Sequence, residues 1–218
     1  FSIGECNFSD HGANRLGASA LMQGLADGYF ILPYTIGTYL SNEINKSNID
    51  TSHEAFERSE SNVLKTINYF ISNKGNASVD VFHRELGNIM WEHCGMSRNK
   101  SGLKLAIDKL KDLKQVFWKD VKIPGKADNL NLELEKAGRV ADLIELGEVM
   151  VHDALQREES CGAHFREEHQ TKEGEALRND EDFTNVFAWA YDGEDSDPKL
   201  NIEKLNFENI SLTQRSYK

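Results

Sequence analysis

Apolar residues recur at steps of three and four along three consecutive stretches of the chain, between residues 78 and 158. The first stretch follows Ser78 and ends near Gly95, the second covers residues 102–121, and the third covers residues 129–158. This spacing puts the apolar side chains on one face of a helix, so each stretch predicts an amphipathic α-helix. Because the three helices have similar lengths and short connections, they favour an antiparallel bundle. The apolar positions that define them include Val81, Phe82, Leu86, Ile89 and Met90, then Leu103, Ala106, Ile107, Leu110, Leu113 and Phe117, then Leu130, Leu134, Ala137, Ala141, Ile144 and Val151.

A further helix is predicted before the bundle, from a start between residues 51 and 59 to Ser72. Its apolar residues also follow helical spacing, at Val63, Leu64, Ile67, Phe70 and Ile71. The segment Lys74-Gly75-Asn76 comes directly after it, and a glycine at this place is typical of a helix C-cap. We therefore expect Gly75 to end this helix.

Residues 18–40 are rich in good helix formers and predict a helical segment that Pro33 ends or kinks. Gly24 and Gly28 lie four residues apart on one face, where we expect the helix to approach a neighbour closely. The apolar region over residues 21–40 is interrupted by Gln23, Asp27 and Pro33. The chain has no run of 18 apolar residues, which is the pattern expected of a membrane-spanning helix.

The helical periodicity stops after Ser160, and residues 183–191 instead carry β-favouring residues that predict a strand. Residues 199–212 predict one or two more strands. The expected fold is mainly α (α+β), with residues 1–41, 42–160 and 161–218 as three parts. The middle part is the helical domain, and the last is a small β segment.

The bulk composition excludes several classes of function. The 218 residues carry a net charge of -11, which argues against broad nucleic-acid binding. The three cysteines, Cys6, Cys94 and Cys161, have irregular spacing that fits neither a disulfide framework nor a zinc site. His93 and Cys94 are adjacent and point in different directions on a helix, so we predict no metal site there.

The segment His11-Gly-Ala-Asn-Arg15-Leu-Gly17 carries the strongest chemical signal. Its glycines let the backbone approach a ligand closely, and the guanidinium of Arg15 matches a carboxylate or phosphate. The helix that follows directs its N-terminus at the same place and adds N–H donors. These features indicate an anion site. The alternative is a structured turn with a surface ion pair, which the spacing alone does not exclude.

The order of several motifs resembles the C-terminal part of the succinate dehydrogenase/fumarate reductase flavoproteins. In that family the segment from Gly4 to Gly17 closes the FAD-binding domain. The similarity extends over nearly the whole chain through the motifs Arg84-Glu-Leu-Gly-Asn-Ile-Met-Trp91, Cys94-Gly-Met96, Leu134-Glu-Lys-Ala-Gly-Arg-Val-Ala141 and Arg157-Glu-Glu-Ser-Cys-Gly-Ala-His-Phe-Arg166.

The resemblance implies a role for individual residues near the substrate. Arg15 would bind a carboxylate of the dicarboxylate substrate, and Ala18 would touch the substrate through its backbone. His11 would help to shape the substrate site. The resemblance implies no catalytic residue and no metal ligand in this chain.

The resemblance also implies residues that hold FAD. Glu5 would hydrogen-bond a ribose of the cofactor, while Ala20 and Leu21 would lie against the flavin and offer it backbone N–H groups. Two positions depart from the family pattern. Ala20 stands where serine is common, so only a backbone contact is expected there. Cys161 stands where arginine is common, which leaves any role of that arginine without a counterpart.

The expected function is therefore the interconversion of succinate and fumarate by hydride transfer to or from FAD, with electrons passed to an iron–sulfur subunit. Membrane anchor subunits would hold the complex on the cytoplasmic face of the cell membrane. The chain begins abruptly at Phe1, and we expect it to be a piece of a longer protein that is inactive by itself. Two alternatives stay open: a docking module for the iron–sulfur subunit, or a flavoprotein of the L-aspartate oxidase or adenylylsulfate reductase type.

Overall fold

A computed structural model describes residues 2–4, 18–46, 50–193, 196, 198–209 and 211–213 of the chain. The chain divides into two compact units, Phe1–Glu60 and Ser61–Lys218, and each is described by itself. Helices dominate both units, and the strands are short. The predicted mainly α fold with a small C-terminal β segment is therefore confirmed. Among the described residues, none of the helices has the length and apolarity to cross a membrane.

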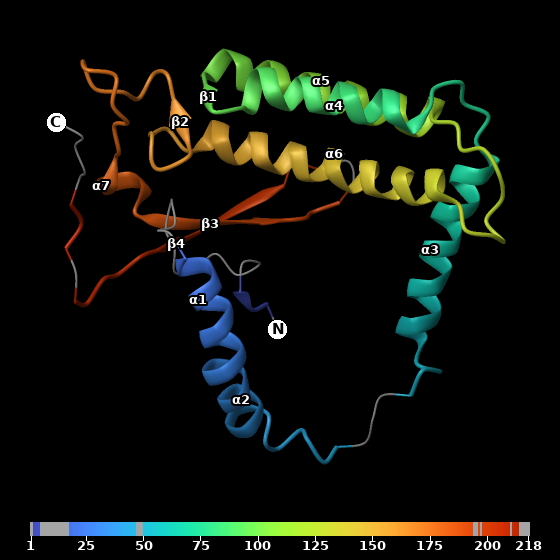
Figure 1. Ribbon diagram of the computed structural model, residues 1–218, viewed down its shortest axis with the longest axis horizontal. Helices are drawn as coiled ribbons and strands as arrows, with labels where there is room; N and C mark the ends of the chain where they lie inside the picture. Colours follow the sequence, from blue (N-terminus) through green and yellow to red (C-terminus); the bar gives the residue numbers. More distant parts are fainter. Residues whose placement is uncertain are drawn as a thin grey trace. The chain divides into compact units, whose positions relative to one another are not determined.

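The second unit contains the predicted bundle, formed by α4 (Val79–Cys94), α5 (Lys100–Asp120) and α6 (Leu132–Gln156). Helices α4 and α5 lie side by side, and α6 runs along both of them (Figure 1). The two longer helices begin at asparagine caps. The side chain of Asn99 accepts the N–H of Gly102, and that of Asn131 accepts the N–H groups of Glu133 and Leu134. The core between the helices includes Phe82, Leu86, Leu103, Leu110, Phe117, Val140, Ile144 and Val151.

Two residues of the predicted apolar stripes do not belong to this core. Val81 is 54% exposed and Leu130 is 92% exposed. Val81 lies on the outer face of α4, next to the buried Phe82. Leu130 precedes the first residue of α6, so helical spacing does not apply to it.

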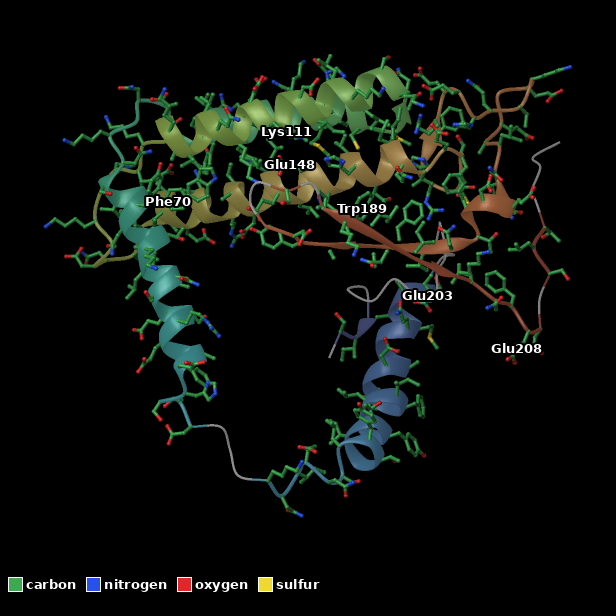
Figure 2. The ribbon with its side chains drawn as sticks, turned by 180° about the vertical axis from the view of Figure 1, so that it is seen from behind. Phe70, Lys111, Glu148, Trp189, Glu203 and Glu208 are labelled. Atoms are coloured by element: carbon green, nitrogen blue, oxygen red, sulfur yellow. The ribbon has the colours of Figure 1, made fainter. Side chains whose placement is uncertain are left out.

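Helix α3 (Glu54–Ser72) spans the boundary between the two units, and its last turns pack on the bundle. Phe70, the only buried residue of this helix, stacks on Trp118 with ring centroids 5.0 Å apart. Figure 2 shows Phe70 where α3 meets the bundle. The helix itself confirms the prediction from helical spacing.

Gly75 has a different role from the predicted C-cap. Its φ is not positive, whereas an αL cap requires a positive φ. A Cβ at Gly75 would lie 2.0 Å from the carbonyl oxygen of Asp120, at the end of α5. The glycine is therefore required because two backbones approach closely, and the C-cap prediction was wrong in its physical reason.

The C-terminal segment contains a strand in each predicted region: β3 (Asn185–Ala190) lies within residues 183–191 and pairs antiparallel with β4 (Lys199–Lys204), which lies within residues 199–212. The helical turn α7 (Asp180–Phe183) precedes β3, so Phe183 is helical and not part of the predicted strand. The indole of Trp189 donates to Asp153 Oδ1 at 2.8 Å, which fixes the hairpin against α6 (Figure 2). A second pair was not predicted: β1 (Ser97–Arg98) lies parallel to β2 (Phe165–Arg166).

In the first unit, one helical path runs from Ser19 to Tyr39. It consists of α1 (Ser19–Ala26), the π-helical turn η2 (Asp27–Ile31), α2 (Leu32–Tyr34) and the π-helical turn η3 (Thr35–Tyr39). Pro33 does not end the path. The N–H of Leu32 bonds the carbonyl of Asp27, five residues back, and this wider turn precedes the proline ring. A wider turn gives room where an ordinary helical turn would clash with the ring.

Candidate functional site at the start of α1

The six residues predicted to contact substrate or cofactor are divided by the structure into two groups. Ala18, Ala20 and Leu21 are described and lie together at the start of α1. The other three, Glu5, His11 and Arg15, lie outside the described residues.

Ala18 has a backbone conformation that is unusual for its residue type. Its φ is 61° and its ψ is -6°, and among the described residues it is the only one other than glycine with a positive φ. For an L-residue this left-handed conformation costs roughly 1–2 kcal/mol. Such strain is concentrated at functional sites, where the surrounding structure holds it. The position predicted to contact substrate through its backbone is therefore a sharp turn into the helix.

Ala18 is the N-cap residue of α1 and accepts its first hydrogen bond. The carbonyl of Ala18 accepts the N–H of Met22 at 3.2 Å, so the helix is closed from its first residue onward. The N–H groups of a first helical turn have no acceptor within the helix and carry its positive dipole end. The start of α1 can therefore donate to carbonyl or anionic oxygens of a ligand.

The side chains of the two predicted flavin contacts point to different surroundings. Ala20 is only 3% exposed, and Leu21 is 71% exposed. The methyl group of Ala20 is therefore buried, while the side chain of Leu21 is open. This arrangement leaves Leu21 open for an apolar or backbone contact.

Residues 2–4 lie against α1 at a point further along the helical path. The N–H of Gly4 donates to Asp27 Oδ2 at 2.9 Å. Gly4 has a φ of +72°, and a Cβ at this residue would lie 3.5 Å from the Cα of Gly24. Close approach was predicted for Gly24 and Gly28. Gly24 makes one, whereas a Cβ at Gly28 would meet none of the described atoms within 4 Å.

A second cluster of charged residues lies at the end of α6, in the other unit. The side chain of Arg166 is 1% exposed. Its Nη1 donates to the carbonyl oxygens of Ala154 at 3.0 Å and Leu155 at 3.2 Å, and its Nε donates to Glu168 Oε2 at 3.1 Å. The last carbonyls of a helix have no partner within it, so Arg166 closes the C-terminus of α6.

Arg157 and Glu159 tie the C-terminal hairpin to the same place. Arg157 donates to Glu159 Oε1 at 2.9 Å and to the carbonyls of Phe183 and Asn185 at 3.1 Å each. Its guanidinium lies over the ring of Phe187, 4.4 Å from the centroid. The motif from Arg157 to Arg166 therefore connects α6, β2 and the hairpin through hydrogen bonds; we call it the α6 joint.

His164 also belongs to the α6 joint, and its two hydrogen-bond partners determine its tautomer. Arg98 Nη1 lies 3.0 Å from its Nδ1, and its Nε2 lies 2.9 Å from the carbonyl oxygen of Arg157. Because the guanidinium can only donate, Nδ1 is the acceptor and Nε2 carries the proton. Burial lowers the pKa of His164 against the raising effect of the bond to Arg157, and the neighbouring Arg98 lowers this pKa further.

The two described cysteines are poor nucleophiles. Burial raises the pKa of the Cys94 thiol and that of the Cys161 thiol, so both stay protonated near neutral pH. The described part of the chain contains no group of three metal-ligating side chains.

Sequence reasoning did not identify Asp27 or Arg166 as parts of a polar network. The only signal for Asp27 was a carboxylate inside an otherwise apolar helical segment.

Comparison with known proteins shows the class of protein, the C-terminal region of a fumarate reductase type flavoprotein. Residues 83–217 match the family described as fumarate reductase flavoprotein C-term, and the chain belongs to this family. The fumarate reductase flavoprotein subunit of Proteus vulgaris is 28% identical over 218 residues, which is 100% of this chain and 34% of that protein. The succinate dehydrogenase flavoprotein subunit of Bacillus subtilis is 25% identical over 217 residues, which is 100% of this chain and 36% of that protein.

Solved structures agree with these relatives. A quinol-fumarate reductase with menaquinol molecules superposes with a TM-score of 0.78 at 27% identity, over 97% of this chain and 35% of that one. An adenylylsulfate reductase from Archaeoglobus fulgidus shares the fold at a TM-score of 0.56 and 18% identity, over 78% of this chain and 27% of that one. The chain spans about a third of the length of the curated relatives that it matches from end to end.

Proposed function

We propose that this chain is the C-terminal part of a FAD-dependent flavoprotein that interconverts succinate and fumarate. The observation that carries the proposal is the end-to-end similarity to fumarate reductase and succinate dehydrogenase flavoprotein subunits, over all 218 residues for the Proteus vulgaris protein. Support also comes from the solved quinol-fumarate reductase, which matches better than the adenylylsulfate reductase in both fold and identity. This difference favours the succinate/fumarate reaction over that of the adenylylsulfate reductase type.

Two features of the described residues support a bound FAD. The left-handed turn at Ala18 leads into a helix start that can donate N–H groups, and the crossing of Gly4 and Gly24 brings two backbones together without side chains between them. In the proposed site Ala20 and Leu21 hold the flavin through their backbone, and Glu5 accepts hydrogen bonds from a ribose hydroxyl. FAD, when bound, supplies the hydride chemistry of the reaction.

Substrate binding is assigned to the segment just before α1. Arg15 donates to a carboxylate of the dicarboxylate, for which its planar guanidinium is suited. His11 shapes the site, and the backbone of Ala18 contacts the substrate. These residues orient the dicarboxylate. Arg15 also offsets the negative charge of the carboxylate next to the carbon that exchanges hydride with FAD, which favours that transfer.

The proposal includes partners. An iron–sulfur subunit exchanges electrons with the flavoprotein, and membrane anchor subunits hold the complex on the cytoplasmic face of the cell membrane. Support comes from the solved quinol-fumarate reductase, whose structure contains menaquinol molecules.

The test is made on the product of the complete reading frame that contains this chain. We expect a protein with a flavin absorption spectrum that oxidises succinate with an artificial acceptor and reduces fumarate with a reduced dye. We expect the isolated 218-residue chain to do neither. A complete protein that holds no flavin, or that turns over neither dicarboxylate, contradicts the proposal.

Variants of Arg15 locate the substrate site. Arg15→Ala is expected to lower kcat/KM for succinate by at least about thirtyfold, because the loss of one partner of a desolvated charge pair typically costs about 2–5 kcal/mol. Arg15→Lys keeps the positive charge but not the planar guanidinium, and its kcat/KM should lie between those of the wild type and Arg15→Ala. Arg139→Ala is the control, since Arg139 is exposed on α6. An Arg15→Ala enzyme with unchanged kcat/KM removes this residue from the site.

A further inference from the structure

A groove in the second unit lies between the last turns of α3 and the first half of α6, and it has no part in the proposed dicarboxylate reaction. The two helices cross at a steep angle (Figure 1), and the groove between them has a volume of about 640 Å³. We call it the α3–α6 groove. Its lining along α6 runs from the cap residue Asn131 to Asp142, roughly 16 Å at about 1.5 Å per residue, which is the length of three helical turns.

The floor of the α3–α6 groove is apolar and only partly covered. Val63 on α3 is 56% exposed, while Ile67 on α3 and Leu134 on α6 are partly buried. Next to the groove in the chain, Leu130 and Leu132 are 92% and 63% exposed. Exposed apolar surface that gathers around a hollow is typical of a site that another molecule covers.

Gly138 leaves the α6 wall of the groove without a side chain. A Cβ at Gly138 would meet no described atom within 4 Å. By contrast, a Cβ at Gly147 of the same helix would lie 3.3 Å from Met90 Sδ, so packing inside the bundle explains that glycine. A glycine inside a helix lowers its stability relative to alanine. Packing among the described residues does not require Gly138, whereas a partner that approaches α6 closely does.

The charged residues that line the α3–α6 groove are both carboxylates. Glu135 and Asp142 lie three residues before and four residues after Gly138, which places them on the same face of α6. Glu135 forms an ion pair with Arg139. The described residues offer the carboxylate of Asp142 neither a hydrogen bond nor an ion pair. A positively charged occupant is therefore favoured, and the net charge of -11 disfavours a second copy of this chain.

We propose that the α3–α6 groove binds an amphipathic helix of a basic partner protein. The partner helix places apolar side chains against Val63 and Leu134, and a lysine or arginine beside Asp142. It comes closest to α6 at Gly138. Recognition of this kind uses residues at steps of three and four as anchors in an apolar groove. The inference goes beyond the proposed dicarboxylate reaction and does not depend on it.

The experiment measures the binding of two synthetic peptides by fluorescence anisotropy, to the product of the complete reading frame and to the 218-residue chain. Both peptides form an amphipathic helix of about four turns with leucine at steps of three and four. One carries lysine beside the leucine stripe, and the other carries glutamate at the same positions. We expect the lysine peptide to bind both proteins at least about tenfold more tightly than the glutamate peptide, because like charges disfavour association.

Three variants locate the binding site. Gly138→Leu fills the groove and should weaken binding of the lysine peptide at least about tenfold, while the midpoint of thermal unfolding should not fall because leucine is a good helix former. Gly87→Leu is the matched control on α4, where a Cβ also meets no described atom within 4 Å, and it should leave binding unchanged. Asp142→Lys should reverse the preference, so that the glutamate peptide binds more tightly.

Several results would overturn the proposal. Equal binding of the two peptides, or binding of neither, removes the basic helix as the occupant. Unchanged binding in Gly138→Leu means that the peptide binds elsewhere. A peptide that binds the 218-residue chain but not the complete protein means that another segment of the same polypeptide fills the groove. Self-association of the complete protein that Gly138→Leu abolishes assigns the groove to a second copy instead.

Discussion

The bundle of the second unit and the helical path of the first unit use similar residues in different ways. In α4, α5 and α6 the apolar stripes meet one another, and Phe82, Leu103, Leu110 and Phe117 are at most 3% exposed. Along the path from Ser19 to Tyr39 most large apolar side chains are exposed, among them Leu21, Met22, Tyr29, Phe30, Tyr34 and Tyr39. The bundle covers one apolar face of each of its helices, whereas the helical path leaves most of its large apolar side chains exposed.

This difference shows that helix formation and helix burial are separate properties of a sequence. Both regions contain good helix formers, and both are helical. Among the described residues, those of the bundle have neighbours that cover an apolar face of each helix, whereas most large apolar residues of the helical path do not. A large exposed apolar surface is typical of an interface. The predicted cofactor and substrate contacts lie at the start of the open region, so the structural elements that stabilise the chain and those assigned to chemistry are different.

The largest effect should separate the two regions directly. Phe117→Ala removes a ring from the centre of the bundle and should lower the free energy of unfolding by about 3–5 kcal/mol. Tyr29→Ser changes a side chain that is 73% exposed, and its effect should stay under about 0.5 kcal/mol. Denaturant unfolding of the 218-residue chain, followed by tryptophan fluorescence and by far-UV circular dichroism, measures both. Equal losses of unfolding free energy in the two variants would contradict the difference in burial between the bundle and the helical path.

A second test concerns the close contact between the residues after α3 and the end of α5. Gly75→Ala places a Cβ 2.0 Å from a backbone oxygen, which cannot move away without shifting α5, and should cost about 3 kcal/mol. Gly87→Ala is the matched control on the exposed face of α4. A Cβ there meets no described atom within 4 Å, so alanine should stabilise the helix by roughly 0.5–1 kcal/mol. The midpoints of thermal unfolding should move in opposite directions.

A third test concerns the joint at the end of α6. Arg166→Met removes the donors that satisfy the carbonyls of Ala154 and Leu155 and should cost about 2 kcal/mol. Arg139→Met changes an exposed arginine of α6, whose ion pair with Glu135 should contribute no more than about 0.5 kcal/mol to the free energy of unfolding. Urea unfolding of both variants gives the comparison. A small loss for Arg166→Met would mean that other groups close the helix.

The smallest effect should be a pH dependence from His164. Its pKa is lowered in the folded state, so the unfolded state binds the proton more tightly. The stability from the neutral imidazole is therefore fully present above the ordinary pKa of about 6.5 and is lost as pH falls through the lower folded pKa. His164→Gln cannot titrate and should flatten the loss of stability below pH 6.5. Urea unfolding at several pH values tests this, and identical slopes would exclude His164 as the cause.

The sequence predicted much of the fold because helical spacing is a local property. The bounds of α3, α4, α5 and α6 lie within a few residues of the predicted ones, and both hairpin strands, β3 and β4, lie inside predicted segments. The order of motifs also identified the family. Contacts between distant residues were less accessible. The pairing of β1 with β2 joins residues nearly 70 positions apart, and neither strand is long enough to show a pattern.

The sequence by itself therefore determined which segments are helical, which family the chain belongs to, and which residues are candidates for the cofactor and substrate sites. Tertiary structure decided which apolar faces are covered, why Gly75 is a glycine, and that Arg166 closes α6 from inside the protein. It also joined Asp27 to Gly4, although 23 residues separate them. The physical reason is that periodicity and caps act within a few residues, whereas burial, backbone approach and long-range hydrogen bonds depend on which segments meet in space.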